Sequence, residues 1–593
     1  MRERKSTTVE QVTISSNDQV LSFAGEEWSR LRGASGAAGA NSSGEVWIGT
    51  WEQLKASQSE FLDRHQCGQW QDKGFSDEFI IIETEGKIVL SGKSERSTLY
   101  AVYQYAQEAW GMQWVYPETV VVEADRGALE RQPVSDGSYL AEERKQVGAH
   151  KQAEAGKQAG EHEQVGEHKQ AGVRDQTGEL VRAYAPRMER RGFVFETINE
   201  PDYLAAMLDW FGKNKINEIF FTFFLWDQVG EAIAPEIAKR GIKVTLGGHS
   251  MKFFLNKGVD MLSNTADHPY TAKTQLDFRD GSWQGPMIKA ITDYCANVPN
   301  LARVSMWPED IAVQSSDGFL DNYLLFSENL NTSLAEAGLQ VEVEHIAYNA
   351  GLAWDMLELN GNKPSSKVDT LLAFWGRDYR YGYEDSPHES DSRAKAAIED
   401  WAKELGLSSS RLTIFEYYSD HFMFTNLFPF LSHRIMDDIA YYEKLNVLGM
   451  VDLVVPYRGP DSYPWKWVHN FNSYVFCRAL WSDDLKQIRN DFYSFYPESE
   501  RAAVRALFET IESKLAAITS WNIPLFPARA VDPEKAQATE DQKLRVLADL
   551  EDMISSVGKV LEQSQLKPDC EPYRHAQYIM EYAGRIRDGW LSR

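Results

Sequence analysis

Residues 190 to 457 alternate eight short apolar or aromatic runs with helix-spaced or loop segments, and this alternation constrains the fold most. The first run, RGFVFET, precedes the helix-spaced DYLAAMLDWFGKNK, and the last run is GMVDLVVPY. Eight strands with intervening segments over about 270 residues are typical of a (β/α)8 barrel. An open doubly wound sheet would need a glycine-rich phosphate loop after its first strand, which FETINEPDY does not supply. The sequence therefore predicts an α/β chain built on a (β/α)8 TIM barrel.

The segments on either side of this region predict three further parts. Residues 1–135 contain the strand-like FIIIETEGKIVLS and the helix-spaced STLYAVYQYAQEAWG, which indicate a small N-terminal α/β domain. Residues 136–185 are dominated by a tract that repeats Lys, Gln, Glu, His, Ala and Gly, so we expect a low-complexity linker or insertion. The catalytic barrel is then expected over 186–465. A C-terminal helical region is expected over 466–593, because Leu and Ile recur there at helical spacing.

Charge and composition exclude several classes of partner. The 88 Asp and Glu against 62 Lys and Arg give a net charge of −26, which would repel phosphate backbones, so we expect no nucleic acid and no membrane partner. The four cysteines lie far apart without a CxxC pair, which argues against a zinc ribbon or a disulfide framework. The amino terminus passes from charged to polar residues without an apolar core, so we expect a cytoplasmic protein. The sequence leaves a homo-oligomer open.

The predicted strands end in aromatic, acidic and amide side chains. In (β/α)8 barrels the chemistry lies at the carboxyl ends of the strands. Aromatic rings cover the apolar faces of sugars while polar groups bind the hydroxyls, so the pattern indicates a pyranose pocket. No HxH or HExxH spacing occurs, and we expect no metal and no cofactor. The candidate substrate-binding residues are Arg191, Glu196, His249, Trp307, His345, Tyr348, Asn349, Trp375, Asp378, Glu416, Tyr417, Tyr418, Trp465 and Trp467.

The segment SMWPEDIAV places Glu309 and Asp310 side by side at the end of the predicted fourth strand. Acidic residues are also common in the first turn of a helix, where the helix dipole favours them. Adjacent side chains of a regular strand face opposite ways, but Pro308 can bend the chain so that both carboxylates reach one pocket. Two like charges there raise one pKa and leave one group as an acid. We therefore expect Glu309 and Asp310 to be catalytic.

Several motifs resemble the hexosaminidase-like retaining glycoside hydrolases of families 20, 84 and 123 and the related family 67 α-glucuronidases. The segment DEFIIIETEGKIVLSGKSERSTLYAVYQYAQEAWGMQWVYPE resembles their non-catalytic N-terminal domain. RRGFVFET is similar to their first barrel strand, and WPED lies where family 20 carries an adjacent Asp-Glu pair. The resemblance covers most of the chain, and bacterial β-N-acetylgalactosaminidases look like the closest type.

The resemblance implies a substrate-assisted retaining mechanism, in which the 2-acetamido group of the substrate attacks and forms an oxazoline. By position, Glu309 would orient the acetamide and Asp310 would be the general acid and base, although the inverted order leaves the two roles open. Tyr417 or Tyr418 resembles the tyrosine that binds the acetamide oxygen. The resemblance also implies that Arg191, with Arg190 as its rival, binds sugar hydroxyl groups. It further implies that three tryptophans surround the N-acetyl group and the sugar ring, namely Trp375, Trp465 and Trp467.

We therefore expect an exo-acting β-N-acetylhexosaminidase that prefers N-acetylgalactosamine and acts on a small carbohydrate or glycoconjugate with a terminal N-acetylhexosamine. An α-glucuronidase-like hydrolase is the alternative enzyme, and it would need cations to pair with a uronate, for which Arg191 and Arg377 are the candidates. A non-catalytic carbohydrate-binding protein on a barrel is the third reading. The galacto or gluco preference and the leaving group stay open at this stage.

Overall fold

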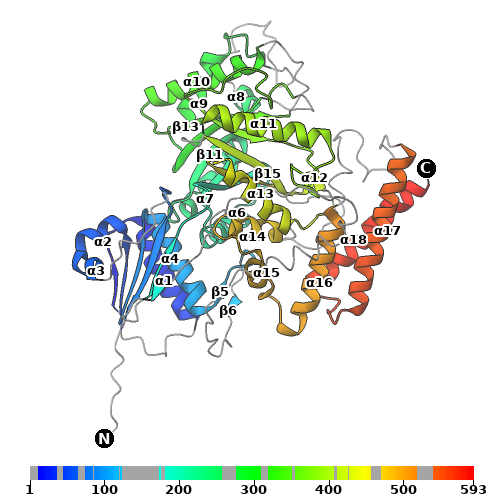
Figure 1. The fold of residues 1–593 in the computed structure, drawn as a ribbon. Coiled ribbons are helices and arrows are strands. Elements are labelled where there is room, and N and C mark those ends of the chain that lie inside the picture. The colour runs from blue at the N-terminus through cyan, green and yellow to red at the C-terminus, as the bar shows by residue number, and fades with distance from the viewer. Residues whose placement is uncertain are drawn as a thin grey trace, which may run out of the picture.

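The fold consists of a barrel, an N-terminal sheet domain and a C-terminal group of helices (Figure 1). The computed structural model describes residues 11–35, 44–64, 74–84, 86–118, 121–122, 173–174, 180–256, 276–308, 318–349, 354–406, 411–424, 427–455, 469–516 and 539–592.

Eight parallel strands close into a barrel, in which β9 lies between β16 and β10. Each strand coincides with one of the eight apolar runs of the sequence, so the predicted (β/α)8 barrel is confirmed. The strands are β9 (Arg190–Phe195), β10 (Glu218–Thr222), β11 (Lys243–Gly248), β12 (Leu301–Met306), β13 (Glu342–Tyr348), β14 (Asp369–Ala373), β15 (Leu412–Asp420) and β16 (Gly449–Val455).

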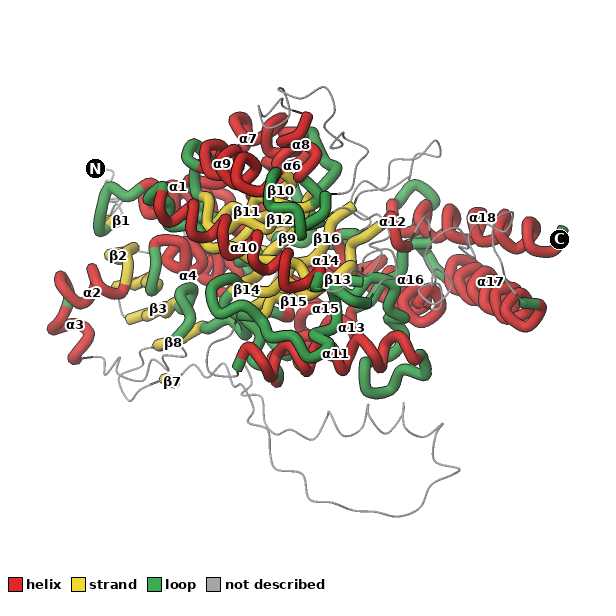
Figure 2. The backbone as a smooth tube through the Cα atoms, turned by 90° about the horizontal axis from the view of Figure 1, so that it is seen from above, coloured by secondary structure: helices red, strands yellow, loops and turns green. Residues whose placement is uncertain are grey.

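Helices surround the barrel strands, as the view in Figure 2 shows. Their starts follow local sequence rules: Pro201 lies in the first turn of α6, where its missing N–H costs no bond, and the Thr222 hydroxyl caps α7 by accepting from the Leu225 N–H at 3.2 Å. The helices are α6 (Pro201–Lys213), α7 (Phe223–Ala238), α8 (Met251–Asn256), α9 (Gln284–Cys295), α10 (Phe319–Glu336), α11 (Glu389–Leu405), α12 (His421–Phe424), α13 (Ser432–Lys444) and α14 (Asn470–Ala479).

The N-terminal domain is a six-stranded sheet in the order β1-β2-β4-β3-β8-β7, packed against helices α1 (Gln19–Ala34) and α4 (Glu95–Trp110). Its edge strand β7 and the neighbouring strand β8 fall inside the range 136–185, where the sequence predicts a linker or insertion. β8 pairs antiparallel with β3, so the chain returns to this sheet before it enters the barrel. The strands are β1 (Gln11–Ile14), β2 (Glu45–Thr50), β3 (Phe79–Thr84), β4 (Lys87–Gly92), β7 (Val173–Arg174) and β8 (Leu180–Tyr184).

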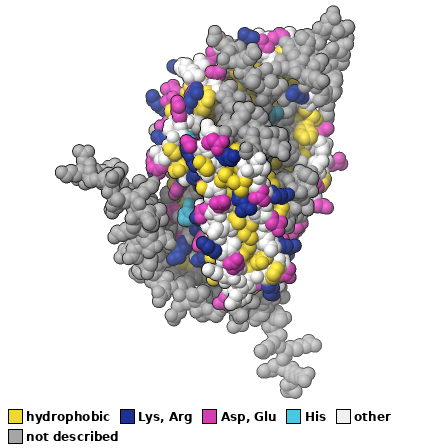
Figure 3. All heavy atoms as spheres, turned by 90° about the vertical axis from the view of Figure 1, so that its right-hand side faces the viewer, with side chains coloured by type: hydrophobic (Ala, Val, Ile, Leu, Met, Phe, Trp, Pro, Cys, Tyr) yellow, Lys and Arg dark blue, Asp and Glu magenta, His cyan; other side chains and the backbone are white. Residues whose placement is uncertain are grey.

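The C-terminal region is helical, as predicted, and comprises α15 (Leu485–Tyr493), α16 (Glu498–Leu515), α17 (Glu540–Gln563) and α18 (Glu571–Leu591). The buried residues of α17 recur every three or four positions, at Val546, Leu550, Met553, Val557 and Leu561. Acidic, basic and apolar side chains are interspersed on the face of the molecule drawn in Figure 3. Among the residues with a described placement, no helix combines the length and the apolar character that a membrane crossing requires.

Candidate active site

Trp307 lies inside the barrel near the carboxyl ends of the strands, which we call the mouth. Its ring makes edge-on contacts with Phe220 of β10, at 5.1 Å between ring centroids, and with Phe415 of β15, at 5.7 Å. Because these partners come from different strands of the closed sheet, the indole points to the barrel interior. Its Nε1 donates to the Ser305 hydroxyl at 2.9 Å, which fixes the ring rotation. Trp307 is 3% exposed and forms a floor beneath the mouth.

The carbonyl oxygen of Pro308 is held by two side chains at the mouth. Nδ1 of His249, which follows β11, lies 2.6 Å from this oxygen, and the Tyr348 hydroxyl of β13 donates to it at 3.3 Å. A carbonyl only accepts, so Nδ1 of His249 carries the proton. The preceding Gly248 has φ +69°, a conformation that favours glycine, and its carbonyl accepts the Trp307 N–H at 3.1 Å. Three hydrogen bonds therefore hold the two residues before Glu309 in the sequence, two of them at the Pro308 carbonyl and one at the Trp307 N–H.

Four of the predicted site residues lie outside the described part of the chain. They are the proposed catalytic pair Glu309 and Asp310 and the tryptophans Trp465 and Trp467.

Glu196, Asn349 and Trp375 also lie at the mouth, each directly or shortly after the end of a strand. Glu196 follows β9 and lies beside Gly248, since a Cβ on that glycine would be 3.7 Å from the Glu196 Oε1. Asn349 follows β13, and its side-chain amide is bonded to the backbone of Trp375 after β14. Trp375 is half-buried. The structure thus brings Glu196, His249, Trp307, Tyr348, Asn349 and Trp375 to one end of the barrel.

Contacts separate the three candidates on β15. The ring of Tyr417 lies 4.8 Å from that of Phe415, which contacts Trp307 in the interior. Tyr418 instead donates to Asp438 of α13 at 2.9 Å, outside the strands. Glu416 lies on the same outer side, where it accepts from the Tyr379 hydroxyl at 2.7 Å, and burial raises its pKa. Tyr417 is therefore the β15 candidate that faces the mouth, whereas Glu416 and Tyr418 face the helices.

His345 also faces the helices. Its ring lies 5.3 Å from Trp401 of α11, and its Nδ1 lies 2.9 Å from the Asp369 carbonyl oxygen, to which it donates. Burial lowers the pKa of His345 to about 4, so the side chain is neutral at pH 7. This placement differs from the expected one, because the two faces of a fully buried strand both read as apolar in the sequence.

Arg191 lies at the opposite end of the barrel from the mouth. It is the second residue of β9, is fully buried, and its guanidinium forms an ion pair with Asp77 of the N-terminal domain. Asp77 also pairs with Arg96 of α4 at 2.8 Å and accepts from Asn217 at 2.8 Å. Arg190, the rival candidate, points into the barrel and pairs with Glu218 at 2.6 Å. Neither arginine is placed to bind a sugar at the mouth, since both lie at the amino end of the strand.

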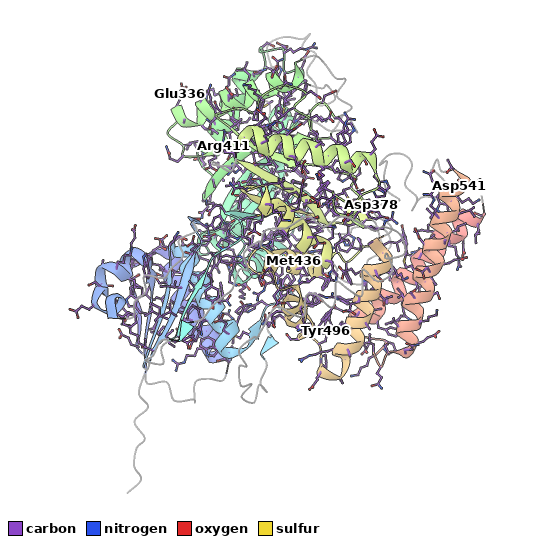
Figure 4. All side chains as sticks on the ribbon, in the orientation of Figure 1. Glu336, Asp378, Arg411, Met436, Tyr496 and Asp541 are labelled. Atoms are coloured by element: carbon purple, nitrogen blue, oxygen red, sulfur yellow. The ribbon has the colours of Figure 1, made fainter. Side chains whose placement is uncertain are left out.

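Asp378 lies at the mouth end, but Arg380 and His388, which follow it closely in the chain, already bind its carboxylate. Its carboxylate accepts from Arg380 and from His388, each at 2.9 Å, and the side chain is fully buried. Figure 4 labels residues at both barrel ends: Arg411 directly precedes β15 at the amino end, and Asp378 follows β14 at the carboxyl end. In the described ranges, no three His, Cys, Asp or Glu side chains lie close enough together to hold a metal ion.

Phe220 and Phe415 were not predicted from the sequence as site residues. Their apolar rings look like core residues in the sequence, and only their contacts with Trp307 show that they support the mouth. The Pro308 carbonyl was missed for a similar reason, because a backbone group carries no signal of its own in the sequence.

Comparisons with solved structures agree with this architecture. No protein-family model matches the sequence, and no curated protein matches it. One similar structure is that of a GH138 enzyme targeting pectin rhamnogalacturonan II. The match covers 98% of this chain and 69% of the chain of that enzyme, with a TM-score of 0.55 and 11% sequence identity. A second is the structure of CpGH84B, where the match covers 99% of this chain and 88% of the chain of CpGH84B, with a TM-score of 0.50 and 9% sequence identity. The chain shares the fold of these two proteins.

Proposed function

We propose that this protein is a glycoside hydrolase that removes terminal β-linked N-acetylhexosamine, with a preference for N-acetylgalactosamine, through an oxazoline intermediate. The observation that carries the proposal is the Pro308 carbonyl, held by His249 and Tyr348 above Trp307, because the acidic pair begins with the next residue. Likeness of fold to the GH138 enzyme and to CpGH84B supports a hydrolase of this general kind.

In this mechanism the two acidic residues divide the work. Glu309 orients the acetamide of the substrate, and Asp310 protonates the oxygen of the leaving group, as the family resemblance implies. Tyr417 is the tyrosine proposed to donate to the acetamide oxygen, because Tyr418 donates to Asp438 instead. The half-buried Trp375 offers an aromatic surface for the sugar ring.

The α-glucuronidase alternative has less support from the described residues. A uronate would need an accessible cation, and Arg191 is buried against Asp77 at the far end of the barrel. Arg377 is 1% exposed, and its guanidinium makes two bonds of 2.8 Å to the Asp438 carboxylate. Both arginines proposed for that role therefore have carboxylate partners within the protein.

The test compares single substitutions of the acidic pair on aryl and alkyl N-acetylhexosaminides. Asp310→Asn should lower turnover by roughly 10²–10⁴-fold on substrates with poor leaving groups and much less on nitrophenyl glycosides. Glu309→Gln should slow every substrate alike, because the acetamide must be oriented before any bond breaks. A thiazoline that mimics the oxazoline should inhibit the wild type.

A second adjacent acidic pair supplies the control. Asp483 and Asp484 are exposed, and Asp484 caps α15 by accepting from the Gln487 N–H at 2.8 Å. Asp483→Asn should leave every rate unchanged. If the Glu309 and Asp310 variants behave like this control and the thiazoline does not bind, the pair is only a helix start and the proposal fails. Sugar binding without turnover in the wild type would instead favour the non-catalytic reading.

A further inference from the structure

Asn349 makes a two-point contact with the backbone of Trp375. Its Nδ2 donates to the Trp375 carbonyl at 2.8 Å, and the Trp375 N–H donates to its Oδ1 at 2.9 Å. The two residues follow β13 and β14, whose last paired residues are Tyr348 and Ala373. The side-chain amide of Asn349 therefore takes the place of a further strand residue and extends the pairing beyond the end of the backbone ladder.

Two more observations show that this contact fixes the backbone on which the indole stands. Asn349 is 6% exposed, so water competes little for either bond. Gly376, the next residue after Trp375, has φ +96°, a conformation that allows the chain to turn sharply there and that other residues rarely adopt. The backbone of Trp375 is thus held by an amide on one side and followed by a turn on the other.

We infer that Asn349 is a positioning residue, which acts on the sugar through Trp375 and not by binding hydroxyl groups itself. Its acceptor oxygen and one N–H are directed at the Trp375 backbone, which sets the orientation of the amide. The inference rests on the proposed function, since it takes Trp375 as the surface on which the sugar ring stacks. Asn349 then determines the affinity for the sugar by setting the position of the indole.

The test uses protein labelled with 5-fluorotryptophan, in which the fluorine resonance of Trp375 is assigned by its loss in Trp375→Phe. Asn349→Ala removes both hydrogen bonds. Asn349→Asp keeps the size of the side chain and the acceptor oxygen but loses the donor, and it replaces the alanine variant in the test if that variant does not fold. Both should shift the Trp375 resonance and raise KM roughly tenfold with a smaller change in kcat.

Asn214→Ala is the matched control. Asn214 is also buried, and its amide donates to the carbonyls of Trp114 at 3.2 Å and Trp210 at 3.0 Å, close to the amino end of the barrel. This variant should lower the melting temperature without moving the Trp375 resonance or KM. An unmoved Trp375 resonance in both Asn349 variants would overturn the inference.

The fluorine resonance also separates this inference from the proposed function. A wild type that hydrolyses no N-acetylhexosaminide, and whose Trp375 resonance does not respond to the thiazoline, would refute the proposed function. The effect of the Asn349 substitutions on the same resonance, measured without any sugar, would still decide whether the amide positions Trp375.

Discussion

His249 and Pro308 meet at the mouth of the barrel, where Nδ1 of the imidazole donates to the proline carbonyl across 2.6 Å. The contact joins the end of the third strand to the end of the fourth. It therefore couples the position of the chain before Glu309 to the barrel wall. Substitutions of His249 should affect turnover, although Nδ1 of His249 donates to the backbone and not to the substrate.

His249→Phe, which keeps an aromatic ring but removes the donor, should lower kcat by roughly 10–100-fold if the acidic pair is displaced. His249→Asn should retain more activity, because its amide nitrogen can replace Nδ1. His345 offers the control, since its Nδ1 also donates to a backbone carbonyl but its ring faces the helices. His345→Phe should leave kcat unchanged, and equal losses in the two phenylalanine variants would contradict a positioning role for His249.

Trp375→Ala should raise KM and lower kcat with little change in melting temperature, because the half-buried indole is proposed to stack on the sugar. Trp401 is the comparison: it is fully buried on α11, and its Nε1 donates to the Leu357 carbonyl at 2.7 Å. Trp401→Ala should cost about 3–5 kcal/mol of stability, as truncated core aromatics do. A large fall in melting temperature with normal kinetics for Trp375→Ala would show that Trp375 is a core residue.

Arg191→Gln should destabilise the protein without changing KM. The substitution leaves the buried Asp77 carboxylate with Arg96 as its remaining arginine partner and breaks the ion pair between the N-terminal domain and the barrel. Breaking a buried ion pair costs about 3–5 kcal/mol, which thermal or urea unfolding would detect. Asp77→Asn should cause a similar loss, and the double variant should lose less than the sum. A raised KM at unchanged stability would restore Arg191 as a sugar ligand.

Stability should fall as the pH drops from about 6.5 toward 4, in part because His345, His469 and His575 are buried. Burial lowers their pKa values to about 4, 4 and 3, respectively. Below about pH 6.5 the unfolded chain binds protons that the folded protein does not, so the free energy of unfolding decreases. The contribution of these histidines is complete above about pH 6.5 and is lost on acidification.

His575 packs against Phe430, at 5.7 Å between ring centroids, so His575→Phe keeps an aromatic ring there. We expect urea unfolding of this variant between pH 7 and pH 4.5 to give a free energy of unfolding that falls less steeply on acidification than in the wild type. The difference in slope should correspond to about one proton fewer taken up on unfolding. An unaltered dependence in His575→Phe would exclude His575 as a source of acid sensitivity.

The sequence by itself determined the elements whose cores are local. Eight apolar runs became eight barrel strands, and the helix-spaced Val546, Leu550 and Met553 became the buried face of α17. These patterns are visible because each element buries its own periodic set of side chains. The domain boundaries and the roles of Glu309, Asp310, Trp465 and Trp467 stay predictions.

Only the tertiary structure decided which side chains meet at the mouth. A parallel barrel strand is buried on both faces, so the sequence of β15 did not show that Tyr417 faces inward while Glu416 and Tyr418 face the helices. The sequence placed Arg191 on the first strand but did not show that its guanidinium would pair with Asp77, which is distant in the chain. The return of β8 to the N-terminal sheet was equally hidden, because strand pairing between distant segments depends on register and packing that local periodicity does not encode.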